Sequence, residues 1–154
     1  SKGATFKKLA QQFHLQMLVE LANQQLEALT PRYELRCIED SLGLTIVDHF
    51  MNDEVRPVLS LSGGESFLVS LALALGIANM ASGTTKLESL FIDEGFGTLD
   101  QSSLHVVMDA LDRLQGQGRK VILISHIADM HERIPVKIQV IPQGSGASKI
   151  EVVG

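Results

Sequence analysis

The feature that most constrains the fold is a run without charged residues, from Ser66 to Thr85, which follows the segment LSGGE. A helix that is apolar on every side must be buried, either in protein or in a membrane. The run is long enough to span a membrane, but small or polar residues interrupt it at Ser66, Ser70, Asn79, Ser82 and Gly83. Because the neighbouring segments have soluble α/β patterns, the run predicts a buried core helix and no membrane span.

The start of this helix has the residues of an anion-binding helix terminus. Ser62 and Glu65 have the S-x-x-E spacing of a capping box. The exposed N–H groups and the dipole of a helix N-terminus favour negative charge. The chain contains no G-x-x-x-x-G-K-[ST] motif, so a phosphate bound here would need its cradle from elsewhere. A capped start to a core helix explains the same residues.

The first third of the chain predicts a long helix and a hairpin. Apolar residues recur at helical spacing from Phe6 to Leu29, and Thr30-Pro31 ends the pattern. The runs YELRCI and LTIVDHF, separated by EDSLG, predict two strands of a hairpin. The segment MNDEVRPVL then predicts a loop.

The second half predicts a βαβ unit and a second hairpin. LESLFIDE and KVILIS have the pattern of buried parallel strands, and residues 101–115 between them have apolar residues at helical spacing. After His126 we expect a short helix that reaches Arg133. VKIQVI and KIEVV predict the final hairpin.

Two acids and a histidine follow the two predicted parallel strands. Asp93 and Glu94 come at the carboxyl end of the first strand, where open α/β sheets bind ligands. Asp93 can hold Mg²⁺ through water, and Glu94 can orient or deprotonate an attacking water. His126 follows the second strand at the same edge, where it can meet a terminal phosphate. Solvated acids and a hydrogen-bonded histidine at strand ends are the structural alternatives.

Asp100 ends the segment GTLD, directly before the predicted helix. Aspartate is favoured as a helix N-cap, which is the structural explanation for this residue. The single cysteine, Cys37, excludes a zinc set of cysteines, and no G-x-S-x-G elbow supports a serine hydrolase. The order of the four segments along the chain is more informative than any one of them.

In this order the segments resemble the second half of an ABC-type ATPase head of the SbcC-like kind. LSGGE is similar to the signature motif, LFIDE to Walker B, GTLD to the D-loop and SH to the switch histidine. The longer segments LSGGESFLVSLALALGIA and LFIDEGFGTLD narrow the resemblance to SbcC-like ATPase subunits of bacterial nucleases. Transporter heads carry proline after the catalytic glutamate, whereas Gly95 and Phe96 follow here. The resemblance runs from about Thr5 to the C-terminus.

The resemblance implies an α/β fold. It would be the C-terminal half of an ABC-type ATPase head, with parallel core strands, flanking helices and β-hairpins, preceded by the foot of a coiled-coil helix. Residues 1–30 would be the returning coiled-coil foot, and residues 31–154 the C-terminal lobe. The phosphate loop would belong to the N-terminal half of the same head. The segment alone is therefore expected to be inactive as an ATPase.

The resemblance also implies the roles of the site residues. ATP and Mg²⁺ would be the cofactors, held between two facing heads. Each helix start would meet a nucleotide held by the opposite head, and Gly63 and Gly64 remove side chains where that surface must come close. The implied residues are Glu94 and His126 for catalysis, Asp93 for Mg²⁺, Ser62, Gly63, Gly64 and Glu65 for the nucleotide in trans, and Asp100 at the dimer interface.

The implied function is an ATPase that gates a nuclease in DNA repair and recombination. Its partners would be a second SbcC-like head and an SbcD-like metallophosphoesterase acting on double-stranded DNA ends and hairpins, with any Mn²⁺ held by that nuclease. An SMC-like or RecN-like clamp without a nuclease, a transporter head and a noncatalytic α/β module are the alternatives.

Composition agrees with this interpretation without specifying it. The mean hydropathy of +0.17 would fit a chain whose apolar surface is normally covered, and the net charge of -5 shows no strongly basic face for nucleic acid. Cys37 as the only cysteine and an N-terminal segment without a signal-peptide pattern predict a cytoplasmic location.

Overall fold

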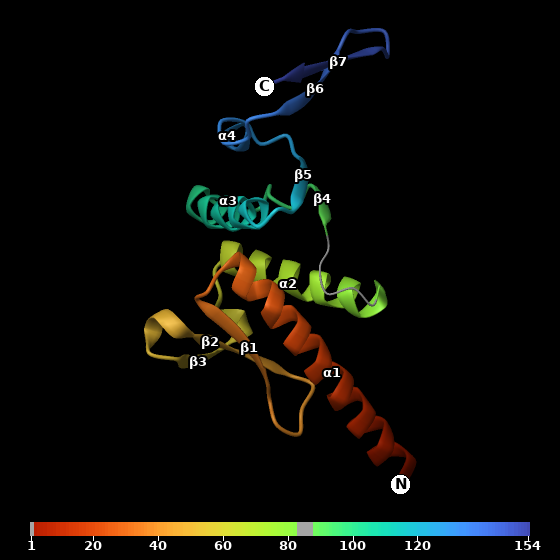
Figure 1. The fold of residues 1–154 in the computed structure, drawn as a ribbon, viewed down its shortest axis with the longest axis vertical. Coiled ribbons are helices and arrows are strands. Elements are labelled where there is room, and N and C mark those ends of the chain that lie inside the picture. Colours follow the sequence, from red (N-terminus) through yellow and green to blue (C-terminus); the bar gives the residue numbers. More distant parts are fainter. Residues whose placement is uncertain (1, 83–87) are drawn as a thin grey trace.

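The computed structural model describes residues 2–82 and 88–154, and Figure 1 shows their arrangement. The long helix α1 (Lys2–Leu29) crosses α2 (Gly63–Ser82), and α3 (Gln101–Gly116) packs on α2. Helix α1 ends where predicted, with Thr30 donating its N–H to the carbonyl of Leu26 at 2.7 Å. A Cβ at Gly76 would lie 3.0 Å from the backbone nitrogen of Ala22, so Gly76 allows α1 and α2 to come close.

A three-stranded antiparallel sheet lies beside α1. Strands β1 (Tyr33–Cys37) and β2 (Leu44–Asp48) form the predicted hairpin. The loop prediction for residues 51–59 was wrong in its middle, because β3 (Glu54–Pro57) pairs with β2. Short 3-10 turns at His49–Met51 and Val58–Ser60 flank β3. Strand β3 is a short, charged edge strand without a buried face, so it lacks the apolar alternation from which strands are predicted.

The predicted βαβ unit is present. Strands β4 (Ser89–Asp93) and β5 (Lys120–Ile124) pair in parallel, and α3 connects them. The pattern predicted buried strands, but in this chain β4 and β5 are covered on one face only. One face packs on the core through Leu90, Ile92, Val121 and Leu123, whereas the other exposes Phe91, Ile122 and Ile124. In the described residues β4 and β5 form a sheet of two strands, so each has an unpaired outer edge.

The chain ends in a hairpin at the end of the molecule opposite to the start of α1 (Figure 1). The short helix α4 (Ala128–His131) stops before the predicted Arg133. Strands β6 (Lys137–Pro142) and β7 (Ser148–Val153) then pair in antiparallel, as predicted. Cross-strand pairs place four exposed aliphatic residues on one face of this hairpin: Ile138, Val140, Ile150 and Val152.

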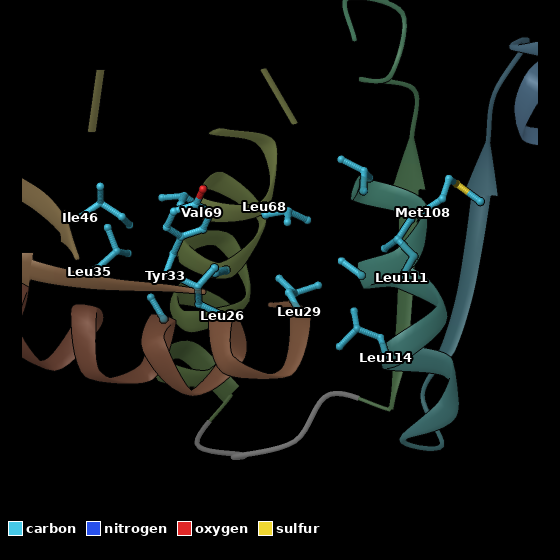
Figure 2. Packing of buried hydrophobic residues seen from close by; sticks show 14 of the residues in the cluster. Leu26, Leu29, Tyr33, Leu35, Ile46, Leu68, Val69, Met108, Leu111 and Leu114 are labelled. Carbon is cyan, nitrogen blue, oxygen red and sulfur yellow. The ribbon is translucent and has the colours of Figure 1, made fainter. Parts of the chain in front are cut away.

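One hydrophobic core joins α1, α2, α3 and the β1–β2 hairpin. Figure 2 shows Leu26 and Leu29 of α1 beside Leu68 of α2, facing Leu111 and Leu114 of α3. Residues Gly63–Ala81 of α2 are long and apolar enough to cross a membrane, yet α2 packs against both α1 and α3. These contacts support the predicted core helix, and the end of the uncharged run lies outside the described residues.

Candidate nucleotide site

The carboxyl ends of β4 and β5 bring the predicted acids and histidine together. Asp93 is the last residue of β4, and Glu94 donates its N–H to the carbonyl of Ile124 at 2.9 Å. The side chains of Glu94 and His126 meet, with Oε1 of Glu94 3.1 Å from Nδ1 of His126. These side chains are 46% and 78% exposed, so both can reach a molecule in solution. The prediction that they share one edge is confirmed.

The backbone at Glu94 is unusual. Its φ is 59°, in the left-handed region that non-glycine residues seldom adopt, and Gly95 follows with a φ of 96°. A non-glycine residue held in such a region carries strain of about 1 to 3 kcal/mol, and the conformation persists only where the surroundings enforce it. The turn that presents the Glu94 carboxylate to His126 is therefore held by contacts with neighbouring parts of the chain.

Both halves of the predicted capping box are formed at the start of α2. Ser62 donates its N–H to Oε2 of Glu65 at 2.8 Å, and Glu65 donates its N–H to Oγ of Ser62 at 3.4 Å. The Tyr33 hydroxyl also donates to Glu65. Burial alone would raise the pKa of Glu65, but the hydrogen bonds from Tyr33 and Ser62 outweigh it, so this pKa lies below its ordinary value. Burial and the same carboxylate raise the pKa of Tyr33.

Arg32 connects this helix start to a buried acid. Its Nη1 lies 3.5 Å from Oε1 of Glu65, and its Nε and Nη2 each donate to Asp48 at 2.9 Å. Asp48 is fully buried and also accepts from Arg56 at 2.8 Å. Arg32 directly precedes β1, and it meets Asp48 because Tyr33 is the partner of Asp48 in the register of β1 and β2. No local sequence pattern predicts this long-range pairing.

The two glycines of LSGGE have different surroundings. A Cβ at Gly64 would lie 2.8 Å from the carbonyl oxygen and 2.9 Å from the Cα of Ser103, which is closer than such atoms can approach. A Cβ at Gly63 would make only an ordinary contact with Leu99 at 3.5 Å. Gly64 thus allows α3 to pack on the start of α2, and the N-termini of the two helices lie side by side.

Asp100 is the N-cap of α3. Its Oδ1 accepts from the N–H of Ser103 at 2.8 Å and from the hydroxyl of Ser102 at 3.1 Å. The hydrogen bonds from Ser103, and then from Ser102, hold the pKa of Asp100 below its usual value. The prediction that Asp100 caps the helix is therefore confirmed. Asp100 is exposed beside the start of α2.

The residue after the Glu94–Gly95 turn was not predicted as part of the site. Phe96 is fully buried, and its ring lies 5.3 Å from that of Phe67 in α2. An aromatic residue between two glycines, in a loop that otherwise carries acids, is the signal that could have identified it.

The donor atoms at this edge suit a hard cation with few protein ligands. The oxygens of Asp93 and Glu94 are of the kind that Mg²⁺ prefers, and Mg²⁺ is commonly bound by one or two carboxylates together with phosphate and water. Within residues 2–82 and 88–154, no group of three or more histidine, cysteine or acidic side chains could hold a metal ion. Mg²⁺ would therefore need ligands from a nucleotide and from water.

Comparisons with known sequences agree with these motifs. The family model described as SbcC/RAD50-like, Walker B motif, matches residues 48–113. The chain is 56% identical over its whole length to the SbcC subunit of the SbcCD nuclease of Pseudomonas aeruginosa, and 49% identical over 99% of its length to that of Rhodobacter capsulatus. It spans 13% and 12% of the length of these relatives, so it corresponds to a small part of each.

Solved structures with the same fold are SMC heads. The SMC head domain from Thermotoga maritima has a TM-score of 0.62, with 23% identity, and the match covers 96% of this chain and 52% of that chain. A structure from work on the ATP-driven dimerization of SMC ATPases also has a TM-score of 0.62, at 20% identity, covering 96% of this chain and 89% of that one. The chain thus carries the Walker B region described by the SbcC/RAD50-like family model, is similar to SbcC sequences over its own whole length, and has the fold of an SMC head.

Proposed function

We propose that this chain is the C-terminal part of an ATPase head in an SbcC-like protein, and that ATP hydrolysis at this head gates a partner nuclease. The observation that carries the proposal is the Glu94–His126 pair, held at the carboxyl edge of β4 and β5. An exposed carboxylate and imidazole 3.1 Å apart can activate a water and contact the phosphate that this water attacks.

In this proposal each residue of the edge has one task. Asp93 holds Mg²⁺ through water, and the bound ion would neutralise phosphate charge. Glu94 accepts a proton from the attacking water. His126 orients the carboxylate through Nδ1, and in its doubly protonated form it would also donate a hydrogen bond from Nε2 to the terminal phosphate.

The start of α2 is proposed to serve the nucleotide of an opposite head. The Glu65 carboxylate is already occupied by Ser62, Tyr33 and Arg32, so its role is to shape the helix start. The Ser62 hydroxyl accepts from Glu65 and keeps its own proton to donate. Together with the exposed helix terminus at Gly63 and the carboxylate of Asp100, it forms the surface that would face the other head.

The partners are proposed from the relatives. Their name describes one component of the SbcCD nuclease, so we propose an SbcD-like metallophosphoesterase as partner and double-stranded DNA ends and hairpins as substrate. The N-terminal half of the same head would supply the phosphate loop, and α1 would continue into a coiled coil. A cytoplasmic location is part of the same proposal.

The test is Glu94→Gln in the full-length protein. We expect ATP affinity to be kept, while turnover falls by about 10²-fold or more, because the amide keeps the shape of the side chain but accepts no proton. Glu88→Gln is the matched control, because it makes the same chemical change at the residue directly before the first residue of β4. Nucleotide binding by calorimetry and steady-state phosphate release measure the two quantities separately.

Turnover by Glu94→Gln within a fewfold of wild type would remove Glu94 from the role of base. An SMC-like clamp would be recognised in the same preparation by ATP-dependent head closure without any nuclease activity when the candidate nuclease partner is added.

A further inference from the structure

The aromatic pair of Phe96 and Phe67 joins the loop after β4 to the start of α2. Phe96 has no exposed surface, and its ring lies 5.3 Å from the ring of Phe67 at an interplanar angle of 37°. Aromatic pairs at this distance contribute about 0.5 to 1.5 kcal/mol beyond the burial of their area. Phe67 lies only a few residues after Glu65, within the first turns of α2. The pair thus connects the two motifs inside one chain.

The loop is attached to α2 at two further points. A Cβ at Gly95 would lie 3.6 Å from Cε2 of Phe67, so the backbone of the turn itself is against that ring. Leu99 donates its N–H to the carbonyl of Phe96 at 3.1 Å, which closes a turn. The Leu99 side chain then lies beside Gly63. The position of residues 95–99 therefore depends on the position of the start of α2.

Glu94 depends on this attachment. Its left-handed backbone is unfavourable for glutamate and persists only where neighbouring contacts enforce it. On one side the contact is the hydrogen bond from the Glu94 N–H to Ile124 in β5. On the other side the nearest buried anchor is Phe96, two residues along the chain. The backbone of Glu94 is thus held by β5 through its own N–H and, two residues later, by a ring packed on α2.

We propose that Phe96, packed on Phe67, is a positioning residue that makes the placement of Glu94 depend on the position of the start of α2. This inference rests on the proposed function. There, Glu94 serves the nucleotide of its own head and Ser62 serves the nucleotide of the opposite head. A shift of α2 on head closure would then be passed through the two rings to the base, so that hydrolysis follows closure.

The experiment compares Phe96→Leu, Phe67→Leu and the double variant in the full-length protein. Leucine keeps an apolar side chain and removes the ring contact. We expect kcat for ATP hydrolysis to fall about tenfold with KM within about twofold, because a small misplacement of a catalytic group affects the chemical step more than binding. The double variant should be no slower than the slower single variant, since both changes remove the same contact.

Leu114→Ala is the matched control for loss of core packing. Leu114 is fully buried in the last turn of α3, away from the loop, and this truncation destabilises the core by about 2 to 5 kcal/mol. We expect its kcat to stay within about twofold of wild type although its melting temperature falls. If Phe96→Leu does not fold, Phe67→Leu, whose ring is only partly buried, decides the question.

The outcomes separate this inference from the proposed function. If wild type hydrolyses ATP and Glu94→Gln does not, but Phe96→Leu and Phe67→Leu keep kcat within about twofold or lose it only as much as Leu114→Ala does, the rings are mere packing and the inference is wrong. If wild type shows no ATP turnover, or Glu94→Gln is fully active, the proposed function itself fails.

Discussion

At the scale of single residues, one methyl group added at Gly64 would collide with the backbone of α3, whereas the same group at Gly63 would find ordinary contact distance. We expect Gly64→Ala to destabilise the chain by about 1 to 3 kcal/mol, because the contact is with backbone atoms that cannot rotate away. Gly63→Ala should leave stability nearly unchanged. Thermal or denaturant unfolding of the two variants measures the difference, and equal stabilities would show that α3 does not pack on Gly64.

Ser62 allows the contact with an opposite head to be tested at one side chain. In the full-length protein Ser62→Arg should keep ATP affinity near wild type and lose ATP-induced dimers, because an exposed bulky side chain would block the facing surface. Sedimentation with and without ATP measures the dimers. Ser70→Arg, an exposed change two turns further along α2, is the control. Intact dimers and normal hydrolysis in Ser62→Arg would reduce the serine to a helix cap.

A melting curve must accompany the Ser62 variant. Loss of an N-cap can itself cost about 0.5 to 2 kcal/mol. Dimer loss counts as support only when the melting curve shows that the variant monomer is folded and has lost no more stability than an N-cap contributes.

At the scale of elements, the β1–β2–β3 sheet is joined to the start of α2 through Asp48. The hydrogen bonds from Arg32, and then the positive charges of Arg32 and Arg56, outweigh burial and hold the pKa of Asp48 below its usual value. A carboxylate whose pKa is lowered by folding adds stability above its unfolded pKa of about 3.9, and that stability is lost as the pH falls through the folded-state pKa. The sheet should therefore weaken below about pH 4.

Asp48→Asn tests this linkage. We expect the free energy of unfolding to fall by about 2 to 4 kcal/mol at neutral pH, because two arginines lose the charge of their shared partner. Both arginines are partly exposed to water, which limits the loss. The variant should also lose part of the acid-dependent fall in stability. Asp112→Asn, which removes one partner of an exposed ion pair with Arg133, should change stability by less than about 1 kcal/mol. Denaturant unfolding at about pH 7 and about pH 3 gives both quantities.

The elements with strong periodicity were predictable from the sequence, and those defined by long-range pairing were not. Helices α1 and α3 and the strands of the βαβ unit have clear apolar patterns, so their existence and order are as expected. Strand β3 depends on pairing with β2, and its exposed charged residues carry no local signal. The open face of β4 and β5 was also beyond the pattern, because periodicity shows which residues are apolar and not what covers them.

The site followed the same rule. The meeting of Glu94 with His126 was predictable, since carboxyl ends of parallel strands share an edge. The capping box was predictable from spacing within one turn. The support of Glu65 by Tyr33, and of the loop by Phe96, depends on residues from other elements, so no local pattern contained it.

At the scale of the whole molecule, exposed apolar faces lie on the β4–β5 sheet, on the β6–β7 hairpin and along α1. We expect the chain to associate with a separately expressed N-terminal half of the head, because that half would cover the open face and edges of β4 and β5. Phe91→Lys, at a side chain that is 69% exposed, should abolish this association without unfolding the chain. Val106→Lys, at an exposed apolar position on α3, should leave it intact.

Co-purification and analytical gel filtration measure the complex. Circular dichroism of each variant alone checks that it is folded. Association by Phe91→Lys as strong as that of the unchanged chain would show that the open face of β4 is not where the N-terminal half binds.

The left-handed turn at Glu94 also determines which replacements a saturation library would retain there. Selection for stability alone would enrich glycine, asparagine and aspartate, which tolerate positive φ, and would deplete valine, isoleucine and threonine, whose branched Cβ does not. Glutamate belongs to neither group, so its presence opposes the preference of the backbone. A library scored once for folding and once for turnover should therefore rank the residues at position 94 in different orders. Glycine should be near the top of the ranking for folding, and glutamate alone at the top of the ranking for turnover.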